Sequence, residues 1–254
     1  MKTVVVIPAR YGSTRFPGKA LALLRGKPLV VHAAQRASLM KTASTVLVAT
    51  DDQRIMDVVK SAGFECVMTG EHQSGSDRVG EVVAGMDVDI VVNVQGDEPL
   101  MNPEDLDRLV VSLDSDKDAD LGTLAHPFID KQEWMMPNVV KLLVDNNNHA
   151  IYFSRAPLPG RFPGREVNPH SAALRHVGVY AWKIKALQKF IEMPPGKLEM
   201  IEGLEQLRAL ESGMVIKVVC DASPTIGVDT PEELEYATML LKNDDLLGQY
   251  LSLD

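Results

Sequence analysis

The chain has 254 residues and a formal net charge of −9, with 45% apolar and 24% charged residues. This length suits one large α/β domain with a substantial core, and the composition is that of an ordinary globular protein. The net negative charge argues against a protein that is held on nucleic acid by general electrostatics. An anionic substrate would therefore need a local cationic pocket.

The termini and the cysteines indicate a cytoplasmic protein. Residues 1–8 reach a strand at once, without the basic segment and long apolar run of a signal peptide. No run of about 18 apolar residues is present to span a bilayer. Cys66 and Cys220 lie at the edges of apolar runs and outside any Cys/His cluster. We expect both to be buried, reduced thiols.

The first third of the chain alternates apolar strand patterns with amphipathic helix patterns. Strands are predicted at 4–7, 45–49 and 64–68, and helices at 28–40 and 53–62. Thr50-Asp51-Asp52 supplies capping residues for the second helix, and Gly63 ends it. This βαβαβ order predicts an α/β fold with a doubly wound parallel sheet.

The rest of the chain continues the alternation with one long interruption. A helix is predicted near 77–86 and another after Asn102-Pro103, and Thr230 is predicted to cap a last helix with Pro231 and Glu233. Residues 155–173 form a long connection without periodicity, as functional loops often do. The remaining expected elements are strands at 89–94, 120–126, 138–145, 149–154, 174–182 and 215–219 and helices at 183–192 and 198–212.

The loop at residues 8–19 follows the first strand and is rich in cations. It holds Gly12 and Gly18, together with Arg10, Arg15 and Lys19. Ligands bind at the carboxyl ends of strands in such sheets, and loop amides with Arg and Lys make a phosphate seat. The spacing excludes a P-loop, because five residues separate Gly12 from Gly18. The alternative is a basic surface loop that only closes a turn.

Two carboxylates follow other expected strands. Asp97 comes just after the strand at 89–94, and Asp229 precedes the expected cap Thr230. Mg²⁺ often uses one or two carboxylates together with phosphate oxygens, so this pair suits a metal-nucleoside triphosphate. The alternatives are that Asp97 caps a turn and that Asp229 is only a residue at a helix N-terminus, although Asn102 and Thr230 are the better caps.

Eight motifs in one order resemble those of the CMP-Kdo synthetases, the 3-deoxy-manno-octulosonate (Kdo) cytidylyltransferases of Gram-negative bacteria. The resemblance spans nearly the whole chain, and the ordered set is far more specific than any one motif. The motifs are PARYGSTRFPGK (8–19), VATD (48–51), HQSGSDR (72–78), NVQGDEP (93–99), YFSR (152–155), RHVGVY (175–180), LEQLR (204–208) and GVDTPE (227–232).

The resemblance implies a Rossmann-like nucleotidyltransferase fold with a mostly parallel, mixed sheet. It further implies that CTP and Kdo give CMP-Kdo and pyrophosphate for the lipopolysaccharide inner core, with Mg²⁺ and as a homodimer. Asp97 and Asp229 would bind Mg²⁺, and Lys19, Arg10 and Asp97 would be catalytic. The implied nucleotide-binding residues are Ala9, Arg10, Ser13, Arg15, Lys19, Ser74, Arg78 and Gln95.

The resemblance places the sugar site in a β-rich region at about 127–213, inserted in a single domain over 1–254. Arg165 is an alternative to Arg161 there, because the loop at 156–172 departs from the family pattern. His176 is as compatible with a core histidine as with a ligand group. Apolar content suggests a dimer interface near 138–182 and 198–212. The implied sugar-binding residues are Arg155, Arg161, His176, Tyr180, Glu205 and Gln206.

Two other functions remain compatible with the residues. The same reaction on 8-amino-Kdo or another acid sugar would differ only in pocket detail. A non-catalytic CTP-binding regulator on the same fold is disfavoured, because a sensor has no need of the carboxylate pair together with Lys19.

Overall fold

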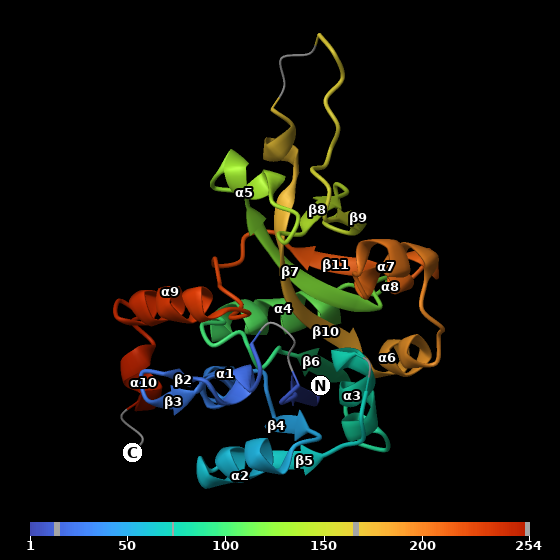
Figure 1. The fold of residues 1–254 in the computed structure, drawn as a ribbon. Coiled ribbons are helices and arrows are strands. Elements are labelled where there is room, and N and C mark those ends of the chain that lie inside the picture. The colour runs from blue at the N-terminus through green and yellow to red at the C-terminus, as the bar shows by residue number, and fades with distance from the viewer. Residues whose placement is uncertain (13–15, 73, 165–167, 252–254) are drawn as a thin grey trace. The chain divides into compact units, whose positions relative to one another are not determined.

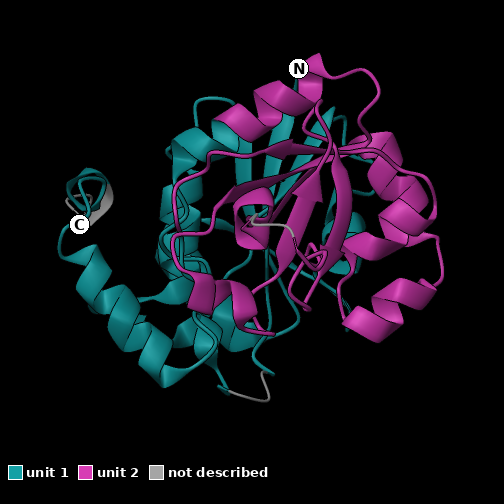
Figure 2. Cartoon of the chain, turned by 90° about the horizontal axis from the view of Figure 1, so that it is seen from above, with its two compact units in different colours: residues 1–107, 225–254 teal, residues 108–224 magenta. Residues whose placement is uncertain are grey.

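A computed structural model describes residues 1–12, 16–72, 74–164 and 168–251. The chain forms two compact units, coloured separately in Figure 2. Unit 1 is Met1–Asp107 with Thr225–Asp254, and unit 2 is Arg108–Pro224. The predicted insertion at 127–213 falls within unit 2; its sugar-binding and dimerisation roles stay predictions. No helix in the described part of the chain is long and apolar enough to cross a membrane.

Unit 1 contains the predicted parallel sheet, whose strands β4, β5 and β6 are labelled in Figure 1. Its strands are β1 (Thr3–Ala9), β4 (Thr45–Thr50), β5 (Glu65–Met68) and β6 (Ile90–Asn93). They lie side by side in the order β6-β1-β4-β5, and every adjacent pair is parallel. Every residue of β1 is buried, as expected for a central strand with both faces covered. The α/β class predicted from the alternating pattern is confirmed.

The helices of unit 1 are set by caps visible in the sequence. Asp52 accepts a hydrogen bond from the Arg54 amide at the start of α2, and Ser74 accepts one from Asp77 at the start of α3. Because Ser74 is the cap, α3 begins two residues before the predicted start at 77. The bounds are α1 (Leu29–Ala37), α2 (Gln53–Ser61), α3 (Gly75–Val83), α4 (Pro103–Ser115, which continues into unit 2), α9 (Pro231–Leu241) and α10 (Leu247–Leu251).

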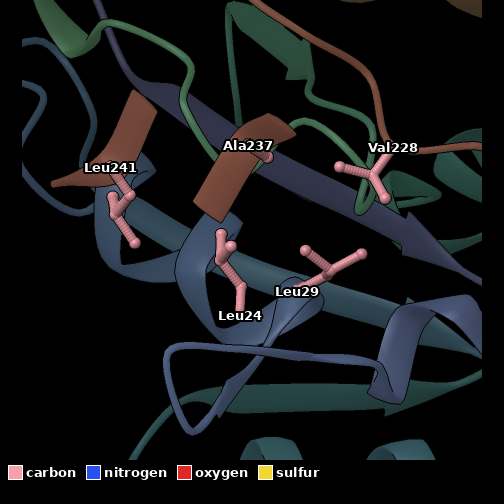
Figure 3. Close-up of a cluster of buried hydrophobic side chains, with 5 residues drawn as sticks. All are labelled: Leu24, Leu29, Val228, Ala237 and Leu241. Atoms are coloured by element: carbon pink, nitrogen blue, oxygen red, sulfur yellow. The ribbon is translucent and has the colours of Figure 1, made fainter. Parts of the chain in front are cut away.

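A small apolar cluster attaches the last part of the chain to the first part of unit 1. A short turn of 3₁₀ helix (Lys19–Leu21) leads into the hairpin β2 (Leu23–Leu24) and β3 (Lys27–Pro28). Leu24 and the first residue of α1, Leu29, pack against Val228, Ala237 and Leu241 (Figure 3). All five side chains are fully buried. The cluster therefore holds the segment that carries Asp229 within unit 1.

Unit 2 has a mixed sheet around β7 (Leu121–Pro127). Its neighbour β10 (Leu174–Lys183) runs antiparallel to it, and β11 (Ile216–Val219) runs parallel. The predicted hairpin of β8 (Lys141–Val144) and β9 (Ala150–Ser154) is confirmed, and β8 also pairs with β10. The other elements are α5 (Lys131–Met135), α6 (Ile184–Ile191), α7 (Lys197–Glu202), α8 (Gln206–Glu211) and a 3₁₀ turn at Pro169–Ala172.

Two predictions about unit 2 and the cysteines are wrong. The helix expected at 198–212 is divided into α7 and α8, because Gly203 adopts a left-handed conformation with φ of +62° that ends the first of them. Cys66 and Cys220 are free thiols, as predicted, but both are only half-buried. Each lies near an end of the strand order, where β5 pairs with β4, and β11 pairs with β7 and bridges to His149 at Lys217.

Candidate active site

A cleft of about 220 Å³ lies in unit 1 at the carboxyl ends of its strands. The residues that line it come from the ends of β1 and β6, the start of α3 and the segment before α9. They include eight predicted nucleotide or metal residues from four separate stretches of chain. The lining residues are Pro8, Ala9, Arg10, Lys19, Ala20, His72, Ser74, Gly75, Arg78, Gln95, Gly96, Asp97 and Asp229.

Lys19 and the two predicted metal ligands meet in this cleft. The Lys19 Nζ atom donates hydrogen bonds to Asp97 Oδ2 and, at 2.6 Å, to Asp229 Oδ1. Burial lowers the pKa of Lys19, but the two carboxylates outweigh that effect and leave the pKa raised. Lys19 is therefore a cation at neutral pH, and among the described residues one of its three N–H donors is left for a further acceptor.

The backbone explains how the carboxylates come together. Residues 95–98 form a turn in which the Glu98 amide donates to the Gln95 carbonyl at 3.1 Å, with Gly96 and Asp97 at its centre. A Cβ atom on Gly96 would lie 3.2 Å from the Pro8 carbonyl oxygen, a tight contact that glycine avoids where the two strand ends approach. The Val228 amide then donates to the Asp97 carbonyl at 2.9 Å.

Asp229 is not the cap of the last helix. Thr230 accepts a hydrogen bond from the Glu233 amide, and the Glu233 carboxylate accepts from the amides of Asp229 and Thr230, at 2.7 and 3.0 Å. This is the predicted capping box, with Pro231 at the first helical position. Asn102 accepts from the Glu104 amide at the start of α4. Other residues cap both helices, so the side chains of Asp97 and Asp229 are available to face the cleft.

The cationic loop is closed at its base. The Gly18 amide donates to the Tyr11 carbonyl at 3.0 Å, and Gly18 has a φ of +71°. The Arg54 guanidinium stacks on the Tyr11 ring, 3.3 Å from its centroid. Arg10 is exposed and lines the cleft. Arg15, predicted to hold the phosphates, and Ser13, predicted to add a loop contact to the nucleotide, lie outside the described residues.

The predicted cytidine-facing residues lie together in the cleft with defined partners. Arg78 is 3% exposed, and its Nη2 atom is 2.6 Å from Asp51 Oδ2 while Nη1 donates to the Thr69 hydroxyl. Gln95 Nε2 donates to Asn93 Oδ1 at 3.1 Å. Asp51 was not among the predicted site residues, although its place after β4 follows the same rule as Asp97 after β6.

The cleft also contains a histidine that the sequence argument passed over. His72 lines it, and its Nε2 atom pairs with the Glu81 carboxylate, which also accepts from the Gly70 amide. The interaction with His72 holds the pKa of Glu81 below its usual range. His72 is the first residue of the motif at 72–78. The only sequence signal for its pairing is that Glu81 follows nine residues later.

All six predicted sugar residues lie in unit 2, and four of them are on β10 or at the start of α8. The rings of His176 and Tyr180 have centroids 5.6 Å apart, and Tyr180 is 9% exposed. Burial and the charge of Glu205 raise the pKa of the Tyr180 phenol. Gln206 is buried, and its Nε2 atom has no hydrogen-bond partner among the described residues. A buried amide of this kind needs an acceptor.

The arginines of the long connection differ in their surroundings. The Arg155 Nε atom donates to the Glu202 carbonyl at 2.7 Å, and Nη2 lies 3.3 Å from the Gly203 carbonyl. The Arg155 carbonyl accepts from Lys141, whose buried ammonium also donates to the carbonyls of Met136 and Val139. Arg161 is exposed. The alternative residue, Arg165, lies outside the described part of the chain.

Comparison with known proteins decides the family. A cytidylyltransferase family model matches residues 4–216. The 3-deoxy-manno-octulosonate cytidylyltransferase of Thermodesulfovibrio yellowstonii is 42% identical over 253 residues, covering 95% of this chain and 98% of the relative. The chain belongs to the CMP-Kdo synthetase family. The enzyme of the same description from Syntrophotalea carbinolica is 45% identical, covering 92% of this chain and 96% of the relative.

Solved structures agree with this membership of the CMP-Kdo synthetase family. A CMP:2-keto-3-deoxy-manno-octonic acid synthetase in complex with CTP aligns with a TM-score of 0.89 at 38% identity, covering 96% of this chain and 99% of that one. A cytidylyltransferase from Leptospira borgpetersenii aligns with a TM-score of 0.63 at 17% identity, over 96% of this chain and 88% of that one, and supports the fold alone.

The carboxylate pair in the cleft is compatible with a divalent cation. Asp97 and Asp229 converge on one ammonium group, so both carboxylates can also reach one metal ion. No group of three or more His, Cys, Asp or Glu side chains that could hold a metal occurs among the described residues. A cation here would complete its shell with phosphate oxygens and water, which is the usual arrangement for Mg²⁺.

Proposed function

We propose that this protein transfers the cytidylyl group of CTP to Kdo, giving CMP-Kdo and pyrophosphate. The observation that carries the proposal is the meeting of Lys19, Asp97 and Asp229 in a cationic cleft, in a chain of the CMP-Kdo synthetase family. The product would be the activated sugar of the lipopolysaccharide inner core, made in the cytoplasm.

The nucleotide would lie in the cleft of unit 1. The third N–H of Lys19 and the exposed Arg10 would bind the phosphates, with Arg15 and Ser13 of the same loop. Arg78, Ser74 and Gln95 would face the cytidine beside the Ala9 backbone. Arg78 suits this role because Asp51 holds its guanidinium in place before a ligand arrives.

The reaction forms one bond and breaks one. The anomeric oxygen of Kdo attacks the α-phosphorus and gives up its proton to solvent. The bond from the α-phosphorus to the bridging oxygen breaks, and its electron pair leaves with pyrophosphate. Positioning and charge stabilisation supply most of the rate in such transfers. Lys19 and Arg10 would stabilise the negative charge that grows on the leaving group.

Mg²⁺ is the proposed cation, with Asp97 and Asp229 as its protein ligands. When bound, it would polarise the α-phosphate and lower the pKa of the sugar hydroxyl. The two aspartates contribute by holding it at a fixed place relative to Lys19. The sugar acid would meet the unit 2 residues Arg155, His176, Tyr180, Glu205 and Gln206, with Arg161 or Arg165 from the loop.

A pyrophosphate-release assay tests the function. The protein is incubated with CTP, Mg²⁺ and one of Kdo, 8-amino-Kdo or N-acetylneuraminate. Release with Kdo and little with the others supports the proposal, whereas release only with 8-amino-Kdo or N-acetylneuraminate moves it to that sugar. Tight CTP binding without release with any sugar would favour a regulator.

Replacing Asp97 by Asn tests the metal role within the same assay. We expect the loss of most turnover with an unchanged circular dichroism spectrum. Asp114→Asn is the control, because Asp114 is an exposed residue of α4 that is not part of the cleft lining. Near wild-type turnover of the Asp97 variant at saturating Mg²⁺ would remove Asp97 from the metal site.

We also propose that the protein is a homodimer through unit 2. Large apolar side chains are exposed in the two regions suggested by the sequence. Met200 and Ile201 on α7 are 76% and 71% exposed, and Ile151 on β9 is 57% exposed. Light scattering would detect the dimer, and Ile201→Lys should dissociate it. A monomeric wild-type protein would refute the proposal.

A further inference from the structure

His176 sits on β10 of unit 2 in a largely apolar environment. The Phe153 ring meets it edge-on at 5.0 Å between centroids, and the centroid of the Tyr180 ring lies 5.6 Å away. Phe153 is fully buried, whereas His176 itself is partly exposed. These surroundings lower the pKa of the imidazole to about 3 through loss of hydration. His176 is therefore neutral at physiological pH.

The polar contact of the His176 ring is with Thr123 of β7. Thr123 Oγ1 lies 2.9 Å from His176 Nε2. The same oxygen lies 2.7 Å from the Val179 carbonyl and 3.3 Å from the Val177 carbonyl. Thr123 is fully buried and stands opposite the register shift that β10 makes between Val177 and Tyr180. One hydroxyl therefore binds both the irregular backbone and the histidine.

The donor and acceptor roles follow from proton counting. A threonine hydroxyl has one hydrogen and two acceptor lone pairs. The carbonyl oxygens of Val177 and Val179 can only accept, so the hydroxyl hydrogen points to Val179, the nearer of the two. Thr123 Oγ1 can then only accept from the histidine. His176 Nε2 must carry the proton, and Nδ1 of the neutral ring must be an acceptor.

We propose that Thr123 is a positioning residue that fixes His176 as its Nε2–H tautomer, so that Nδ1 accepts a hydrogen bond from a hydroxyl of the sugar. No hydrogen bond to Nδ1 is found in the described part of the chain. The lone pair of His176 Nδ1 would repel a carboxylate. The carboxylate of the sugar must therefore be bound away from His176, by cationic side chains. This inference rests on the proposed function, since it assigns one role within the proposed sugar site.

Nuclear magnetic resonance of the full chain with ¹⁵N-labelled histidine tests the tautomer without any activity measurement. We expect the His176 signals of a neutral Nε2–H ring, unchanged between pH 5.5 and pH 8. Adding Kdo should shift the Nδ1 resonance as it accepts a hydrogen bond. An Nδ1–H tautomer, or an imidazolium that titrates near neutral pH, would overturn the proposal even if the enzyme is active.

Two substitutions at Thr123 provide the kinetic test. Thr123→Val keeps the shape but removes the hydroxyl, and should raise the KM for Kdo about tenfold, the scale of one hydrogen bond, with an unchanged KM for CTP. Thr123→Ser keeps the hydroxyl and should restore both the KM and the tautomer signals. Equal effects on both substrates, or an unchanged KM for Kdo in the Val variant, would refute the positioning role. Absence of pyrophosphate release in the wild type would instead refute the proposed function.

Discussion

Replacing Lys19 by Met is expected to weaken catalysis and to strengthen metal binding at the same time. In the structure the Lys19 ammonium lies between Asp97 and Asp229, where it neutralises the carboxylates that a divalent cation would use. In the absence of nucleotide, a metal ion must compete with this ammonium. Met is nearly as long as Lys but uncharged, so the substitution removes the competitor and leaves the carboxylates.

The size of the effect follows from the two contacts that are lost. Hydrogen bonds to charged groups contribute about 1.5–3 kcal/mol each when buried. The side chains of Asp97 and Asp229 are 25% and 35% exposed, so solvent screening reduces each contact to about 1 kcal/mol. The sum of about 2 kcal/mol corresponds to roughly thirtyfold tighter metal binding. Turnover with CTP should fall by about 10²–10³, the cost of losing one donor to the transition state.

Titration with Mn²⁺, followed by electron paramagnetic resonance, measures the first effect, and pyrophosphate release measures the second. Lys41→Met is the control, because Lys41 is exposed and not part of the cleft lining. It should change neither quantity. Metal affinity that is unchanged or weaker in the Lys19 variant would refute the reasoning, because it would show that the ammonium and the metal do not share the carboxylates.

Three further changes are expected to have graded effects. Thr230→Ala removes the cap of α9 and should lower the free energy of unfolding by about 1 kcal/mol and Tm by about 2–4 °C. Gly18→Ala forces a Cβ within 3.1 Å of the Tyr11 ring at a φ of +71°, so the KM for CTP should rise severalfold. The hydrogen bond from His149 holds the pKa of Asp116 below its ordinary value. This interaction stabilises the folded protein above pH ~4, and the stabilisation is lost as the pH falls further. The free energy of unfolding, measured with urea, should therefore fall more between pH 7 and pH 3 in the wild type than in Asp116→Asn.

Matched variants separate these effects from general damage. Thr238→Ala lies in the same helix but removes only a bond to the Leu234 carbonyl, and equal destabilisation would exclude a capping role for Thr230. Gly63→Ala also places a side chain at a left-handed φ, of +82°, but with nothing within 4 Å of the new Cβ and outside the cleft lining, so the KM for CTP should not change. Asp114→Asn should leave the pH dependence of unfolding as in the wild type. A wild-type pH dependence in Asp116→Asn would disprove the third prediction.

The parallel sheet of unit 1 was predictable because local and global signals agree there. The strand at 4–7 is apolar at every position, and Asp52 provides a helix start where the pattern changes. The division of α7 from α8 was not predictable from periodicity, because apolar residues continue past Gly203. The left-handed conformation of that glycine is fixed by its tertiary setting, and glycine adopts either sign of φ at similar cost.

The residues of the candidate site were predictable where they follow strands, and their partners were not. Asp97 and Asp229 were named because each follows a strand or precedes a cap. Asp51 also follows a strand, yet its role depends on Arg78, which lies 27 residues later and is brought close only by the sheet. Thr123 resembles any other strand threonine in sequence. Its importance comes from the register shift of the neighbouring strand, which no local pattern shows.

Packing of the chain around Asp229 explains how Asp97 and Asp229 can form one candidate metal site although they lie far apart in sequence. Asp97 and Asp229 are separated by all of Arg108–Pro224, yet the entropy of loop closure rises only with the logarithm of length, by about 0.6 kcal/mol for each doubling. Full burial of Leu241 alone contributes about 1.5–3 kcal/mol, which offsets the entropy cost of several doublings of the loop length. The cluster with Leu24 and Leu29 therefore does more than fill the core of unit 1. It places Asp229 beside Lys19, so substitutions that weaken the cluster should weaken metal binding before they unfold the sheet.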